Sequence, residues 1–309
     1  MTMITVLAGG TGAAKFLRGL VALMEPELLT VIGNTGDDTE IWGLHISPDL
    51  DTVTYTLAGL IDEGKGWGIK DDSFCCLQAM AVLGGETWFN LGDRDLATHL
   101  FRTERLRAGQ SLSEVTDAIR AGLGVRSRIL PMSDQPVRTR IRSTTGWLTF
   151  QEFFVREKAQ VEVLDVAYEG AGAARAAPGV VEAIREARAV LVCPSNPVTS
   201  IGPILAVPGV VEALGKTPAV VTAISPIVAG EAVSGPAGGL MAAKGLPVSA
   251  VGVAGAYRQW LDVMVLDHQD QHLTPQLLRL GVSAVVTDTL MTDREREAAL
   301  ARAVLETLR

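Results

Sequence analysis

The chain has 309 residues, of which 48% are hydrophobic and 20% are charged, with a net charge of −8. This composition supports a folded core and excludes an intrinsically disordered chain. The acidic balance argues against nucleic acid as a partner, and no apolar run approaches the roughly 18 residues of a membrane span. The N-terminus lacks the pattern of a signal peptide, and three cysteines form no disulfide framework. We therefore expect a soluble, cytoplasmic protein with no nucleic-acid or membrane partner.

The chain opens with a predicted strand, helix and strand. A β-branched apolar run predicts a strand over residues 2–8, helical spacing predicts a helix over 13–24, and a second strand is expected at 28–33. This order is typical of a doubly wound parallel sheet. Further helices are predicted at 52–61, 73–83, 93–106 and 111–123, the last with a Ser111–Glu114 capping box.

The pattern changes in the middle of the chain. Strands of a mainly antiparallel section are predicted at 128–130, 137–143, 146–150 and 162–166, with a hairpin turn at 143–146. The alternation then resumes with helices predicted at 180–187, 210–214 and 294–308, the last capped by Thr292 and Glu295, and strands at 189–193, 219–224, 263–266 and 284–287. The predicted fold class is α/β: a Rossmann-like parallel sheet with helices on both faces and a smaller inserted α+β region. We assign residues 1–110 and 175–309 to the core and 111–174 to the inserted subdomain.

A glycine-rich turn follows the first predicted strand, in the sequence AGGTGAAK. Gly9, Gly10 and Gly12 allow the backbone to approach a phosphate, and a helix N-terminus follows with free N–H groups. The turn lacks the Walker A spacing, and Lys15 stands where a dinucleotide fingerprint has its third glycine. A phosphate or nucleotide contact is favoured over a plain tight turn.

Carboxylates cluster after the second strand and before the next helix. The pair in Asn34–Asp38 could bind a ribose hydroxyl, help to hold a metal, or form a solvated turn. Asp49 and Asp51 lie two residues apart, so an extended stretch would place both on one side, which suits Mg²⁺ or a polyol hydroxyl. The alternative is that one of them only caps the helix that follows.

A third cluster, LGDRDLATH, covers residues 91–99. We expect Asp93 to cap the helix, with Arg94 and His99 facing outward near its start. A catalytic or phosphate site is favoured over a surface ion-pair cluster because the glycine turn exposes these groups.

Rigid loops of neutral hydrogen-bonding residues follow later strands. Residues 194–203 hold three prolines together with Asn196, Thr199 and Ser200, which suit a nucleobase or phosphate oxygens. Residues 225–227 and 234–238 repeat this chemistry, although a plain structured loop is as good an interpretation of each. The spacing of four histidines fits no zinc site, and no nucleophile elbow is present. Trp42, Trp67 and Trp88 could line a flat-ring pocket or pack in the core.

Taken together, ten motifs carry a family resemblance. They are GGTGAAKFLRGL, NTGDD, SPDLDTV, WFNLGDRDLATH, LPMSD, FQEFFV, PSNPVTSIGPIL, SPI, SGPAG and DTLMTD, in this order from Gly9 to Asp293. The chain resembles the 2-phospho-L-lactate transferase (CofD) family of coenzyme F-420 biosynthesis over nearly its full length. The resemblance implies a Rossmann-like fold and a homodimer. It also implies transfer of a phospholactyl or phosphoenolpyruvyl group from a guanosine-diphosphate-linked donor to the deazaflavin Fo, with GMP released and Mg²⁺ as cofactor.

The resemblance also assigns residues. Asp51 and Arg94 belong to the deazaflavin site, and we add Asp93 and His99 there, with His99 orienting Asp93 or Asp95. Asp49, Asp51 and Arg94 are the predicted catalytic residues, and Asp49 and Asp51 the metal ligands. The predicted nucleotide-binding residues are Gly9, Gly10, Thr11, Gly12, Lys15, Asn196, Thr199, Ser200 and Gly202. The alternative is a UDP-sugar-binding regulator of the YvcK-like gluconeogenesis-factor family, against which SPDLDTV and LGDRDLATH argue. An NAD-dependent enzyme is disfavoured by the missing third glycine.

Overall fold

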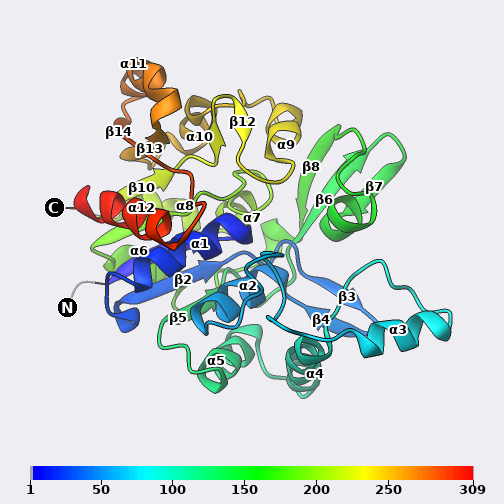
Figure 1. Ribbon diagram of the computed structural model, residues 1–309. Coiled ribbons are helices and arrows are strands. Elements are labelled where there is room, and N and C mark those ends of the chain that lie inside the picture. Colours follow the sequence, from blue (N-terminus) through cyan, green and yellow to red (C-terminus); the bar gives the residue numbers. More distant parts are fainter. Residues whose placement is uncertain (1–2, 309) are drawn as a thin grey trace.

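The computed structural model describes residues 3–308, so residue 2 of the predicted first strand lies outside the described part. The strands of the central sheet are β1 (Ile4–Ala8), β2 (Leu29–Gly33), β5 (Arg128–Pro131), β9 (Ala189–Val192), β10 (Val220–Ile224), β13 (Val263–Asp267) and β14 (Ser283–Thr287). They lie in the order β14-β13-β10-β9-β1-β2-β5, and every neighbouring pair is parallel (Figure 1). The predicted Rossmann-like sheet is confirmed.

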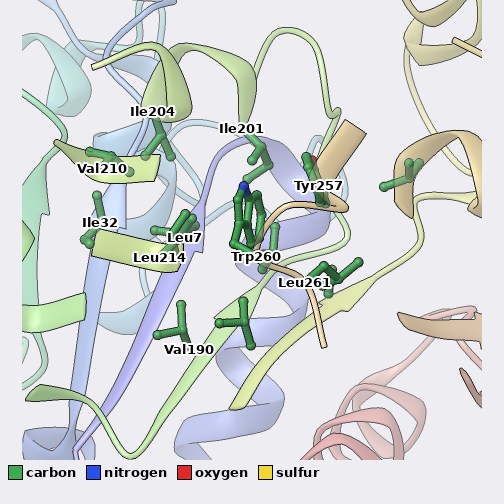
Figure 2. Close-up of a cluster of buried hydrophobic side chains, with 14 of the residues drawn as sticks. Leu7, Ile32, Val190, Ile201, Ile204, Val210, Leu214, Tyr257, Trp260 and Leu261 are labelled. Carbon is green, nitrogen blue, oxygen red and sulfur yellow. The ribbon is translucent and has the colours of Figure 1, made fainter. Parts of the chain in front are cut away.

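Alternation along the strands builds a hydrophobic core on each face of this sheet. Val6 packs with Phe16 and Val304 on one face, below α1 (Gly10–Val21), α2 (Pro48–Leu57) and α12 (Arg294–Glu306). Its neighbour Leu7 packs with Val210 on the other face (Figure 2), below α6 (Val180–Glu186), α8 (Val210–Lys216) and α10 (Ala250–Tyr257). Helices therefore cover both faces, as predicted.

A smaller antiparallel sheet stands beside the central one (Figure 1). Its strands β6 (Arg138–Ser143), β7 (Gly146–Thr149) and β8 (Asp165–Glu169) lie in the order β7-β6-β8, and the predicted hairpin turn joins the first two. β8 begins three residues later than the strand predicted at 162–166. The strand predicted at 128–130 was assigned to this antiparallel section, and that is wrong. β5 pairs parallel to β2, with Ile129 and Leu130 buried, as suits an edge strand covered on both sides.

Two predicted helices begin or are capped differently in the structure, and several short helices and strands of the structure were not predicted. The helix predicted at 52–61 begins at Pro48, which takes the first helical position, where its missing N–H costs nothing. The last helix is capped by Asp293, whose side chain accepts from the Arg296 N–H, and not by Thr292. The Ser111–Glu114 capping box is confirmed.

The remaining helices are α3 (Cys75–Val82), α4 (Asp93–Arg107), α5 (Leu112–Gly122), α7 (Gly202–Ala206), α9 (Ala237–Ala243) and α11 (Thr274–Arg279). There are also two hairpins: β3 (Thr39–Ile41) pairs with β4 (Leu44–Ile46), and β11 (Ile227–Val228) pairs with β12 (Glu231–Ala232). Within residues 3–308 no helix is long and apolar enough to cross a membrane.

Candidate functional site

A cavity of about 680 Å³ opens at the carboxyl ends of the central strands. Its lining includes residues of the loops that follow β1, β2, β9, β10 and β14. In the sheet, β2 lies on one side of β1 and β9 lies on the other. The loops that follow β1 and β9 therefore diverge at this edge of the sheet. Open parallel sheets bind their ligands at such a switch point. All the predicted site residues line this cavity except Asp93, Arg94 and Gly202.

The glycine-rich turn forms one wall and opens α1. Gly9 precedes the first turn of the helix without any side-chain cap, which leaves backbone N–H groups for a ligand. The Ser195 hydroxyl donates to the Gly9 carbonyl at 2.7 Å and fixes the turn against the loop after β9. A Cβ on Gly12 would lie 2.4 Å from the Pro194 carbonyl oxygen, so backbone meets backbone at this point. The requirement for glycine therefore has a structural cause at Gly12.

Replacing Gly12 with alanine should separate the two loops. We expect the free energy of unfolding to fall by about 1–3 kcal/mol, because the added methyl overlaps backbone that cannot rotate away. Nucleotide affinity, measured by calorimetry on the folded variant, should fall as well. Gly215→Ala in α8 is the control, since nothing lies within 4 Å of its Cβ position. Equal thermal melting and affinity in the two variants would contradict the close approach.

Asp49 ties the glycine-rich turn to the acidic segment after β2. It lies in the first turn of α2, not in an extended stretch, and accepts from Gly10 N–H at 2.8 Å and from Asn34 Nδ2 at 2.9 Å. Burial raises the pKa of Asp49 to about 6 against these two hydrogen bonds, and the charge of Asp38 adds to the rise. Asp49 is not a simple cap of the helix in which it lies, because both of its donors are outside α2: Gly10 belongs to α1, and Asn34 lies in the loop after β2.

Asp37 and Asp38 are buried, so the interpretation of this pair as a solvated turn is wrong. Burial raises the pKa of Asp37 well above its usual range, and the charge of Asp49 raises it further. Asp37 lines the cavity, and one carboxylate oxygen of each of the two residues is buried without a hydrogen-bond partner. An unpartnered buried carboxylate oxygen is costly unless a cation or proton meets it.

Asp51 belongs to a buried polar network shared by α2 and α4. Arg102 is 1% exposed and holds both oxygens of Asp51: its Nη1 donates at 3.1 Å and its Nη2 donates to the other oxygen. Nη1 also lies 3.3 Å from His99 Nδ1, and His99 Nε2 lies 3.3 Å from Asp95. The Tyr55 hydroxyl donates to Asp95 at 2.6 Å. His99 is therefore buried and does not face outward as predicted; of the two aspartates it was expected to orient, it contacts Asp95.

Asp93 and Arg94 lie outside the cavity lining. Asp93 does not cap its own helix: it accepts from Ser73 Oγ and from Cys75 and Cys76 N–H, and so caps α3. These contacts, Ser73 first, lower the pKa of Asp93 to about 2. Arg94 is exposed and donates to the Lys70 carbonyl at 3.0 Å. Among residues 3–308 it forms no ion pair with either neighbouring aspartate. Its role at the deazaflavin stays a prediction.

The loop after β9 is built by its own side chains. Asn196 Oδ1 accepts from the N–H groups of Val198 and Thr199, which fixes the turn. Gly202 instead packs against Tyr168, whose hydroxyl would lie 2.1 Å from a Cβ there, so its glycine has a packing reason. Lys15 Nζ donates to the Met291 carbonyl at 3.1 Å, and both residues line the cavity.

Aromatic side chains form a further wall. Trp67 lines the cavity with Phe89, Phe150 and Phe154, whereas Trp42 and Trp88 do not. The predicted neutral loops at 225–227 and 234–238 contribute Ser225, Pro226, Ser234, Gly235, Pro236 and Ala237 to the lining. Residues that the sequence interpretation left without a role include Tyr55 and Arg102. One signal could have found Arg102: it repeats with Asp95 and His99 at the i, i+4, i+7 spacing of a single helix face.

Comparison with known proteins shows the family to which the chain belongs. A family model described as 2-phospho-L-lactate transferase CofD matches residues 4–306. A phosphoenolpyruvate transferase of Kitasatospora aureofaciens is 46% identical over 98% of this chain and 96% of its own. A 2-phospho-L-lactate transferase of Methanocaldococcus jannaschii is 42% identical over 98% of this chain and 97% of its own.

A solved structure shares the fold. A UPF0052 family protein of Bacillus halodurans superposes with a TM-score of 0.68 at 17% identity, covering 98% of each chain. This similarity bears on the architecture only. The family model and the sequence relatives extend over nearly the whole chain, including the loops that line the cavity. The chain is therefore a member of the 2-phospho-L-lactate transferase CofD family.

Proposed function

We propose that the protein transfers a phospholactyl or phosphoenolpyruvyl group from a guanosine-diphosphate-linked donor to the terminal ribityl hydroxyl of the deazaflavin Fo. The hydroxyl oxygen forms a bond to the distal phosphorus, the bond from that phosphorus to the bridging oxygen breaks, and GMP leaves while the hydroxyl proton departs. The observation that carries the proposal is one continuous cavity with a helix N-terminus in its wall, bordered by rigid neutral loops and by carboxylates beside aromatic rings.

The donor fits the glycine-rich turn and the loops that follow β9 and β10. A diphosphate needs N–H donors and positive charge, which the N-terminus of α1 and Lys15 supply. Ser234 lines the cavity close to Pro236 and offers a neutral hydrogen bond, as a nucleobase requires, whereas the Ser225 hydroxyl is already bonded to the backbone of Ile227. Phosphoryl-type transfer depends mainly on positioning and charge neutralisation, so no covalent nucleophile is needed.

The acceptor fits the other part of the lining. Trp67, Phe89 and Phe150 present rings on which a flat tricyclic system can stack. Asp51 and Asp95 offer carboxylate oxygens as acceptors for polyol hydroxyls. We place the deazaflavin ring against the aromatic side chains and its ribityl chain along these carboxylates.

A magnesium ion fits the donor set, with one change from the sequence-based assignment. Within residues 3–308 no group of three His, Cys, Asp or Glu side chains could hold a metal, but Mg²⁺ commonly uses one or two carboxylates with substrate phosphates. Asp51 is paired through both oxygens with the Arg102 cation, which repels a second cation, whereas Asp49 accepts only from the neutral N–H groups of Gly10 and Asn34. Asp37 has an unpartnered buried oxygen and lies close enough to Asp49 for their charges to interact. We propose Asp37 and Asp49 as the ligands. The ion would neutralise the diphosphate beside these carboxylates.

Chelation tests this assignment. Exhaustive EDTA treatment should lower the turnover rate by on the order of 100-fold, and added Mg²⁺ should restore it, because the diphosphate would otherwise meet unneutralised carboxylates. Asp37→Asn should raise the Mg²⁺ concentration needed for half-maximal rate. Asp165→Asn, on the exposed surface, is the control and should leave it unchanged. Full activity after chelation would contradict a metal role.

The transfer itself is tested by mixing the protein with Fo and each guanylated donor. Mass spectrometry should show a product carrying the added phospho-acid, together with GMP. The two donor acids differ by two hydrogens, and comparing their rates assigns the natural one. No product from either donor, combined with tight UDP-sugar binding, would instead support a regulator of the YvcK-like type.

A further inference from the structure

Helix α4 carries three polar side chains on one face, and two of them line the cavity. Asp95, His99 and Arg102 follow the i, i+4, i+7 spacing, and all three are buried. Asp95 and His99 line the cavity, and so does Asp51 from α2. Arg102 does not line it. Its guanidinium lies behind Asp51 and His99, so it reaches the cavity only through those two side chains.

The contacts of Arg102 fix both side chains in front of it. Nη1 and Nη2 each bind one oxygen of Asp51, which makes a forked, two-point contact. Nη1 is also 3.3 Å from His99 Nδ1 and donates to the His45 carbonyl at 3.4 Å. Nη1 carries two hydrogens and has three acceptors within reach, so these contacts fix the place of the His99 ring, whose Nε2 lies 3.3 Å from Asp95. One buried cation therefore sets the orientation of a carboxylate and the position of an imidazole.

A fully buried arginine is costly unless its partners justify it. Removing a guanidinium from water is offset only by a well-formed ion pair, and Asp51 provides that pair. An apolar side chain in this position would fill the same space at lower cost, so burial alone does not account for the choice. What the planar fork adds is a fixed direction for the Asp51 carboxylate, which a lysine or an apolar residue cannot supply.

We infer that Arg102 is the positioning residue of the acceptor end of the site, holding Asp51 and His99 in the orientation that receives the ribityl hydroxyl. The inference rests on the proposed transfer to Fo. Arg102 touches no substrate in this scheme and acts through Asp51. Its removal should change the rate at which bound substrates react, and leave the binding of the guanylated donor, at the other end of the cavity, almost unaffected.

The chain provides a matched control for this idea. Arg18 also makes a two-point contact, here with Glu297, at 3.0 Å through Nε and 2.5 Å through Nη2. This pair joins α1 to α12, is almost as buried, and does not line the cavity. Arg18→Lys and Arg102→Lys therefore each remove a two-point contact with a carboxylate while keeping the charge. The first contact lies away from the site, and the second lies directly behind it.

The first measurement compares these two variants. Arg102→Lys should lower kcat about 10- to 100-fold with the KM for the guanylated donor changed less than about twofold, because misplacement of a positioned group costs rate. Arg18→Lys should lower the melting temperature but keep kcat within about twofold of the wild type. Folded Arg102→Lys protein with wild-type kcat would overturn the inference. If that variant does not fold, Arg102→Gln, which keeps two N–H donors, takes its place with the same expectation.

The second measurement asks whether Arg102 acts through Asp51. In an Asp51→Asn background, Arg102→Lys should lower kcat by less than about threefold, since the group it positions has already gone. A purely structural arginine would give the same factor in both backgrounds, and that outcome would overturn the inference. Wild-type protein that forms no product would instead sink the proposed function. Product formation by the wild type with a fully multiplicative cycle would refute the role of Arg102 alone.

Discussion

Replacing Asp51 with asparagine should lower kcat/KM for transfer by about 100-fold or more, because it removes a carboxylate that we place against the reacting hydroxyl. The Asp51 side chain lines the cavity and is held from behind by Arg102. Its carboxylate therefore has a fixed orientation, which a water molecule in its place would not have. Steady-state assays with Fo and the guanylated donor measure the loss. Near-normal kcat/KM in this variant would refute the assignment.

The same substitution should also weaken the fold, which the sequence alone did not predict. An asparagine offers one acceptor where Arg102 needs two, and the guanidinium would remain buried without a counter-charge. Breaking a buried pair in this way costs about 3–5 kcal/mol. Urea unfolding measures the change. Glu297→Gln is the matched control, because it breaks the Arg18 pair and should lose stability while the folded protein keeps its activity.

The core of the fold was predictable because the strands carry their own signal. Ile4–Ala8 and Leu29–Gly33 are buried on both sides of a parallel sheet, so they form continuous apolar runs, and a glycine turn ends the first. The same logic failed for Arg128–Pro131. That strand has a charged first residue and a proline at its end, and only its pairing with β2 makes it part of the central sheet.

The position of site residues on loops was predictable, but the direction of their side chains was not. The carboxyl ends of parallel strands meet at one edge, so Gly9 and Ser200 could be brought together from sequence order alone. Asp93 and His99 depend on contacts that local sequence does not encode. Asp93 turns toward α3 because the backbone N–H groups of Cys75 and Cys76, 18 and 17 residues earlier, need an acceptor at the start of that helix. His99 lies on the same helix face as Asp95 and Arg102, and its two ring nitrogens contact these two side chains.

The last large expected effect concerns Asp49 and pH. Burial raises the pKa of this carboxyl to about 6 in the folded state, from 3.8 in the absence of that environment. Between these two values the folded protein binds more protons than the unfolded chain, so stability falls as pH rises through this window. Above pH 6 the full cost is present, on the order of 3 kcal/mol. Stability is therefore highest, as far as this group is concerned, on the acidic side of the window.

Asp49→Asn isolates that contribution when unfolding is followed in EDTA at pH 4 and pH 7.5. Asparagine cannot ionise, but it meets the Asn34 amide with a second donor, and this costs the variant the same amount at both pH values. The variant should therefore gain stability relative to the wild type between pH 4 and pH 7.5, by about 2 kcal/mol. Mg²⁺ added at pH 7.5 should recover much of the wild-type deficit and stabilise the variant less, because the variant keeps only one of the two proposed carboxylate ligands. A difference between the two proteins that does not change with pH would show that folding leaves the pKa of Asp49 unchanged, and would remove the electrostatic reason for a cation at this position.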